Sequence, residues 1–177
     1  DHRSELDSEP LTISQTPDAA ELPYDTKAVA RIIRESKESG DAVRGASVFA
    51  DAKLACLSCH KVGTHGGAVG PDLSTIAKDR TMSQIVESVF WPQREVADKF
   101  MTWKLLTADG SVMTGFKHSS NDQQVVIRDS ASAKLTAIAV DEIEEEIAAG
   151  SVMPSGLTAA MSRQQQADLI RFLGELG

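Results

Sequence analysis

Apolar residues recur along this chain with two different periods, and the change of period divides it into helical segments and a central β region. Helical spacing predicts four helices, over residues 26–39, 41–53, 81–91 and 162–175. The last two begin with capping boxes, formed by Thr81 with Gln84 and by Ser162 with Gln165. Residues 1–24 contain three prolines, many acids and no apolar period, which predicts an unfolded lead-in.

Between the third and fourth predicted helices, apolar and polar residues alternate instead. The alternation predicts four strands, over residues 101–107, 112–118, 123–129 and 133–140. Asp109 and Gly110 lie between the first two strands and form a strong hairpin signal. The sequence therefore predicts an antiparallel meander of four strands, inserted among the helices at about residues 100–140.

Composition, charge and hydropathy add further constraints. The 177 residues include only 5 Phe, 2 Trp and 1 Tyr, which leaves room for a bulky non-protein group in the interior. The net charge of -8 argues against a nucleic acid as partner. The chain has two acidic runs, residues 1–25 and the DEIEEE segment at 141–146, which are interpreted as a solvated tail and a solvated turn. No apolar run approaches the roughly 20 residues of a membrane-spanning helix, so the chain is not expected to span a membrane.

The most distinctive chemistry of the chain lies in the segment ACLSCH. Both cysteines of the chain, Cys56 and Cys59, lie here, and His60 follows directly. A thioredoxin-like dithiol would need the pair at a strand-to-helix junction, whereas a helix is predicted before it and a glycine-rich loop after it. A zinc site would need two further ligands, for which His65 and His118 are available in unrelated segments.

Covalent haem is the third chemistry that uses such a pair, and the one that the sequence favours. Two thiols three positions apart can add to the two vinyl groups at one edge of a porphyrin, and Cys-x-x-Cys-His is the signature of c-type attachment. His60 would then lie under the iron as an axial ligand. A ligating histidine usually donates its second ring N–H to a carbonyl or a carboxylate, and the GPDL segment at 70–73 offers a backbone carbonyl near Pro71.

The opposite face of the iron needs a second ligand, a substrate site or nothing. The SVMPSGL segment at 151–157 offers Met153, whose thioether is a soft, neutral donor that favours ferrous iron. Met161 is the rival methionine, His65 and His118 are the alternatives with nitrogen donors, and an open site is the fourth alternative. The remaining methionines are interpreted as packing residues: Met82, Met101 and Met113.

Together these residues resemble a c-type cytochrome with His/Met ligation, and most closely the haem-binding domain of the planctomycete and verrucomicrobial type. The family pattern consists of GD-x-x-x-G-x-x-x-F, CxxCH, GxxGPDL, a segment of the DPS or WPQ kind, a DG turn, MPxGL and a closing helix. The matching elements here are Gly40-Asp41 with Gly45 and Phe49, 56–60, 67–73, Trp91-Pro92-Gln93, Asp109-Gly110, 153–157 and the helix at 162–175. The resemblance covers about residues 40–177.

The resemblance implies a cofactor and its ligands. One covalently attached haem c would be linked through Cys56 and Cys59. His60 and Met153 would be the axial ligands of its iron, and Pro71 the proximal hydrogen-bond acceptor.

The resemblance also implies a fold that is mainly α: a class I cytochrome c-like helical fold with a small antiparallel β-sheet of about four strands inserted before the methionine strap. Residues 1–40 would form an acidic lead-in or linker with one helix, and residues 41–177 the c-type cytochrome domain. The helices at 41–53 and 162–175 would pack across each other, with Gly45 and Phe49 near Leu169 and Leu173.

The function that the resemblance implies is electron transfer, not catalysis. The redox partners would be a dehydrogenase-type donor and a cytochrome or oxidase acceptor, and in the family such domains often stand beside propeller-like dehydrogenase domains in larger chains. The alternatives are a haem sensor or peroxidase-like protein with a labile sixth ligand, and an assembly module in which the haem is structural.

Two further expectations concern the surroundings of the protein. Periplasmic or otherwise exported localisation follows from the family, because c-type haem is normally attached outside the cytoplasm. The inserted sheet is a candidate for docking a partner or for forming a homodimer through an exposed edge strand.

Overall fold

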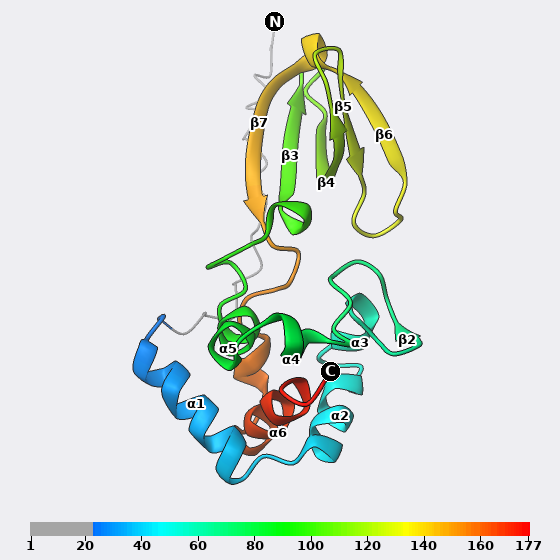
Figure 1. Ribbon diagram of the computed structural model, residues 1–177. Coiled ribbons are helices and arrows are strands. Elements are labelled where there is room, and N and C mark those ends of the chain that lie inside the picture. The colour runs from blue at the N-terminus through cyan, green and yellow to red at the C-terminus, as the bar shows by residue number, and fades with distance from the viewer. Residues whose placement is uncertain (1–22) are drawn as a thin grey trace, which may run out of the picture.

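The computed structural model describes residues 23–177, so nearly all of the predicted lead-in lies outside the described residues. Two modules follow one another along the long axis of Figure 1. The helical module contains α1 (Thr26–Glu38), α2 (Ala42–Ala50), α3 (Cys56–Cys59), α4 (Ile76–Asp79), α5 (Met82–Phe90) and α6 (Arg163–Leu173), with the short strands β1 (Lys61–Val62) and β2 (His65–Gly66). The sheet module contains β3 (Thr102–Thr107), β4 (Val112–Ser120), β5 (Gln124–Arg128), β6 (Leu135–Ala139) and β7 (Ile143–Gly150).

Each module has a hydrophobic core of its own. The core of the helical module is built from α1, α2, α5 and α6, and its buried side chains include Val29, Ile32, Phe49, Val86, Leu169 and Ile170. The core of the sheet module consists of Leu105, Val125, Ile127 and Ile138. The two clusters share no residue, so the apolar burial that stabilises one module is separate from that of the other.

The first helix belongs to the helical core. Its N-cap is Asp25, whose carboxylate accepts a hydrogen bond from the backbone N–H of Lys27 at 2.9 Å. Val29 and Ile32 are buried in the core that α5 and α6 also line. Residues 26–38 therefore pack as part of the helical module. No helix within residues 23–177 is long and apolar enough to cross a membrane.

Helix α2 crosses α6 at a position where α2 has no side chain. A Cβ built on Gly45 would meet the backbone carbonyl of Asp168 and lie 2.6 Å from the Cβ of Phe172, so only glycine lets the two helices approach this closely. Beside this contact, the rings of Phe49 and Phe172 pack with their centroids 5.6 Å apart. The predicted crossing of these helices is confirmed, but the residues nearest to Gly45 are Asp168 and Phe172 instead of the predicted Leu169 and Leu173.

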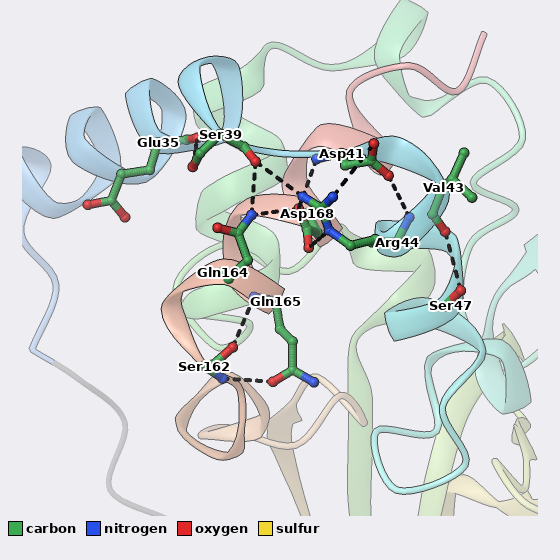
Figure 2. Close-up of polar contacts among 10 residues, drawn as sticks. All are labelled: Glu35, Ser39, Asp41, Val43, Arg44, Ser47, Ser162, Gln164, Gln165 and Asp168. Carbon is green, nitrogen blue, oxygen red and sulfur yellow. Dashed lines mark hydrogen bonds and ion pairs between the residues drawn. The ribbon is translucent and has the colours of Figure 1, made fainter.

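A buried carboxylate fixes the same crossing through polar contacts, which Figure 2 shows. Asp168 is only 2% exposed. It accepts hydrogen bonds from the backbone N–H of Asp41 at 2.8 Å, from Nε and Nη2 of Arg44 at 2.8 Å each, and from Nε2 of Gln164 at 2.9 Å. Gln164 also donates to the carbonyl of Ser39 at 2.8 Å. The connection between α1 and α2 is thereby tied to α6.

The sheet module begins as the predicted meander. Strands β3, β4, β5 and β6 pair in order of sequence, and all neighbours are antiparallel. Alternate residues of these strands point to one face of the sheet, where they form its core. The four predicted strands are therefore confirmed.

The fifth strand, β7, was not predicted. It pairs with β3 at the edge of the sheet and includes the glutamates 144–146. Only η2 (Val140–Glu142) forms a turn, so the interpretation of 141–146 as a solvated turn is wrong for most of that segment. Glutamates are depleted in strands, but an edge strand tolerates them because nearly all of β7 is exposed to solvent.

The short η2 connection shows that the sheet is curled. It joins β6 to β7, which are the two opposite edges of the five-stranded sheet. In a flat sheet these edges would lie about 19 Å apart, since neighbouring strands are about 4.8 Å apart. The four Cα–Cα steps from the end of β6 to the start of β7 reach at most about 15 Å. The edges must therefore approach each other at this end, at the top of Figure 1.

The mainly α fold class predicted from the sequence is wrong. Along residues 23–177, a five-stranded antiparallel sheet accompanies six α-helices, so the chain is a mixed α/β protein. The prediction ended the insertion at about residue 140, whereas β7 extends it to Gly150.

The acid stability of the α2–α6 crossing can be tested at Asp168. Its hydrogen bond from Arg44 is the main reason that the pKa of Asp168 lies below its usual value, and burial opposes this shift. Its contribution to stability is therefore fully present above the unfolded-state pKa of about 3.9 and is lost as the pH falls through the lower folded-state pKa. We predict that Asp168→Asn lowers the free energy of unfolding by about 1–2 kcal/mol at pH 7, and that this deficit shrinks below pH 4.

The measurement is chemical denaturation of the wild type and the variant between pH 7 and pH 2. Asp122→Asn is the matched control, because Asp122 is exposed in the turn between β4 and β5. The control should follow the wild type at every pH. A deficit for Asp168→Asn that does not change with pH would show that the charge of Asp168 is not what stabilises the crossing.

Candidate functional site

The segment that carries both cysteines begins at a tight turn behind α2. Asp51 ends α2, and its carbonyl accepts hydrogen bonds from the backbone N–H groups of Leu54 at 3.0 Å and Ala55 at 3.1 Å. Ala55 takes a left-handed conformation with φ of 55°, which is unfavourable for a residue with a side chain. This turn starts α3, a single helical turn from Cys56 to Cys59.

Helix α3 presents the two thiols on one side. Residues three positions apart on a helix are surface neighbours, and both thiols are free and half-buried. Burial raises the pKa of Cys56, so this thiol stays protonated at neutral pH. A dithiol oxidoreductase needs the opposite shift, towards the thiolate. The helix also follows α2 and a turn instead of a strand, so the structure gives no support to the dithiol interpretation.

His60 directly follows α3, and a hydrogen bond fixes the orientation of its ring. Its Nδ1 lies 3.0 Å from the backbone carbonyl of Pro71, which is the acceptor that the sequence predicts. Burial lowers the pKa of His60, and the hydrogen bond to Pro71 opposes this shift. A neutral ring that donates from Nδ1 to a carbonyl carries its lone pair on Nε2. His60 is therefore prepared to bind a metal ion through Nε2.

The glycine-rich loop after His60 is bonded back onto α3. The backbone N–H of Gly67 donates to the carbonyl of Leu57 at 2.9 Å, and that of Gly70 donates to the carbonyl of Cys59 at 2.8 Å. A Cβ built on Gly70 would lie 2.6 Å from Cε1 of the His60 ring. The loop therefore packs directly against the imidazole, and glycine at position 70 leaves room for the ring.

The residues that the sequence offers as a second axial ligand lie in different surroundings. Met161 is 8% exposed and belongs to the helical core, and Met82 packs against the same core. His118 is an exposed residue of β4, in the sheet module, and His65 is an exposed residue of β2. Met153 lies outside both cores on the segment between β7 and α6, and its side chain is half-buried.

Gln93 is a residue that the sequence analysis did not single out for the site. Its side-chain Nε2 donates to the carbonyls of Ser151 and Met153 at 3.1 Å each, and its Oε1 accepts from the N–H of Ser151 at 2.8 Å. Gln93 follows the predicted helix end at Pro92, which is a local signal for a loop. Its partners lie 58 and 60 positions further along the chain, and nothing in the local sequence indicates them.

A zinc site is not assembled by the candidate ligands in the described chain. Within residues 23–177, no three side chains of His, Cys, Asp or Glu come together in a group that could hold a metal ion. Within the described residues, the two thiols and His60 are thus neighbours in sequence only, and neither His65 nor His118 joins them in such a group.

The residues around α3 fit a covalently bound haem. Two free thiols share one side of a helical turn, which suits attachment to one edge of a planar group. The adjacent imidazole of His60 is neutral, and its Nδ1 is held by the backbone carbonyl of Pro71. Histidines that bind a metal through one ring nitrogen usually have such a hydrogen bond at the other. The loop that packs on this imidazole lacks a side chain at the closest position, Gly70. His60 offers a nitrogen donor beside the thiols, and Met153, outside both hydrophobic cores, offers a thioether sulfur.

No protein-family model matches the chain, and no curated protein matches it.

The role of Gly70 gives a test of the site geometry. We predict that Gly70→Ala displaces the His60 ring and lengthens or breaks its bond to Pro71, because the added methyl group has no space beside Cε1. Ala68→Val is the control, since Ala68 is exposed on the same loop. The measurement is nitrogen-15 NMR of the His60 ring. An unchanged Nδ1–H resonance in Gly70→Ala would show that the ring does not depend on this space.

Proposed function

We propose that this protein is a monohaem c-type cytochrome that carries single electrons, and that it is not an enzyme. The observation that carries the proposal is the orientation of His60. Directly after the two thiols, its ring is neutral and donates from Nδ1 to Pro71, which leaves Nε2 to bind iron.

The residues that would hold the haem have separate tasks. Cys56 and Cys59 would form the thioether links by adding each S–H group across a vinyl group, which consumes no oxidant. His60 binds through Nε2, and Met153 binds through its thioether sulfur. When bound, haem c supplies an Fe(III)/Fe(II) couple that takes up and releases one electron.

The protein's contribution to electron transfer is to keep the ligands fixed. Pro71 holds the His60 ring, and the loop at residues 67–70 is bonded to α3 behind it. A neutral thioether raises the reduction potential relative to a second histidine, because it stabilises ferrous iron. Such a carrier needs no general base and no activated nucleophile.

The partners would be a dehydrogenase-type donor and a cytochrome or oxidase acceptor, in a periplasmic or otherwise exported location. Docking would be weak and steered by charge. Self-association through the sheet module is the alternative use of its edges. Pairing of β7 with β7 of a second copy would place glutamates 144–146 against each other, which is unfavourable. A homodimer would therefore use β6, where Leu135 is 50% exposed.

The first test is an optical spectrum of the purified protein, recorded before and after denaturing extraction. We predict haem that resists extraction, a low-spin reduced spectrum, and a far-red iron–sulfur charge-transfer band in the oxidised state. Attached haem that is high-spin and binds carbon monoxide readily would instead indicate a sensor or a peroxidase-like protein. Absence of haem would contradict the proposal.

The same spectrum identifies the sulfur ligand. Met153→Ala should keep the haem attached, abolish the far-red band and lower the reduction potential, because the iron loses its thioether. Met161→Leu is the matched control: it conserves volume in the helical core and should keep the band. The reverse pattern would transfer the ligand assignment to Met161.

Excision of the sheet module tests whether it contributes to the haem pocket. Thr102 and Gly150 are direct cross-strand partners, so their Cα atoms lie about 5 Å apart. We predict that replacing residues 103–149 by a Gly-Ser-Gly link preserves the haem spectrum, because the sheet has its own core. Loss of attached, low-spin haem would show instead that the sheet forms part of the pocket wall.

A further inference from the structure

The side chain of Gln93 connects the helical module to the backbone around Met153. It makes three hydrogen bonds with two residues of this segment, and together they use both the amide N–H₂ group and the amide oxygen. One of the carbonyls that it binds belongs to Met153 itself, at 3.1 Å from Nε2. We call residues 150–153 the strap.

Gln93 is well placed to act as an anchor. It follows Trp91 and Pro92, which are both buried at the end of α5, and Trp91 is 3% exposed within the helical core. The backbone that carries Gln93 is therefore fixed by apolar packing, while its side chain extends outwards to the strap. The strap itself has no apolar core position, since neither hydrophobic core includes Met153.

The beginning of the strap is shaped around the Gln93 amide. Gly150 has φ of +82°, and a Cβ built there would collide with Oε1 of Gln93. Thr102 on β3 donates from Oγ1 to the carbonyl of Gly150 at 2.7 Å, and Ser151 Oγ accepts from the N–H of Met153 at 3.1 Å. Glycine at position 150 therefore provides both the backbone conformation and the space that the amide requires.

We propose that Gln93 is a positioning residue for the Met153 ligand: it holds the strap in one conformation and thereby keeps the sulfur on the iron against competing ligands. This inference rests on the proposed function. Fixing the carbonyls of residues 151 and 153 restricts the backbone that carries the thioether. A released strap would let the sulfur leave, so its displacement by an external ligand becomes easier.

The amide is required at position 93, not merely a side chain of this length. Two of its three bonds are donated by Nε2 to carbonyl oxygens. A carboxylate has nearly the same shape but cannot donate, and it would face both carbonyls with lone pairs. Gln93→Glu therefore removes the hold on Met153 without removing the side chain, whereas Gln93→Ala removes both.

The experiment uses the haem-loaded protein in its oxidised state. Imidazole is added, and the loss of the far-red iron–sulfur band gives the concentration at which half of the sulfur is displaced. For Gln93→Ala and Gln93→Glu we expect attached haem and a midpoint about tenfold lower than in the wild type, as for the loss of partly exposed hydrogen bonds. Gln123→Ala is the matched control, an exposed glutamine in the β4–β5 turn, and should keep the wild-type midpoint.

A second readout does not depend on the iron. Because Oε1 of Gln93 accepts from the N–H of Ser151, exchange of this amide hydrogen should be faster in Gln93→Ala than in the wild type. Wild-type midpoints and unchanged Ser151 exchange in both Gln93 variants would overturn the inference while leaving the cytochrome proposal intact. A wild-type protein that lacks the iron–sulfur band would overturn the cytochrome proposal and this inference with it.

Discussion

The crossing of α2 over α6 is the contact on which the helical module depends. Gly45 lets the backbones touch, and Asp168 binds Arg44 across the crossing from 124 positions away in the chain. Helix α3 begins one tight turn after α2, and α6 begins shortly after the segment that contains Met153. The crossing therefore joins the helix that precedes the cysteines to the helix that follows the Met153 segment. A change at this contact would act on both segments without touching the ligands that we propose.

The residues that we propose as haem-binding lie mostly on irregular backbone that is held by regular elements. The loop at 67–70 is held by backbone hydrogen bonds to α3. The strap is hydrogen-bonded to the side chain of Gln93, which follows α5 in the sequence. Two of these side chains are uncharged at pH 7: burial lowers the pKa of His60 and raises the pKa of the Cys56 thiol. Neutral groups carry a small desolvation penalty when they are covered, which is compatible with the proposed haem site.

The parts of the structure that could be predicted are those with local causes. The capping boxes at Thr81 and Ser162 determine where α5 and α6 begin, and Pro71 follows His60 closely enough to be recognised as its acceptor. Strand β7 could not be recognised, because its glutamates are unfavourable in a strand and tolerated only at an edge, which is a property of the assembled sheet. The Gln93 contact was equally inaccessible, since an amide that binds backbone carbonyls places no constraint on which side chains its partners have.

The pairing of Thr102 with Gly150 also affects how the chain folds. These residues are 48 positions apart and are joined by a hydrogen bond. Strands β3 to β6 pair with their neighbours in sequence, and such local contacts form quickly. Once the sheet has formed, it acts as an internal cross-link, because it shortens the loop that must close before α6 can dock on α2. The entropic cost of closing a loop rises with its length. A sheet that folds early shortens this loop, and so lowers the entropic barrier to assembly of the helical module.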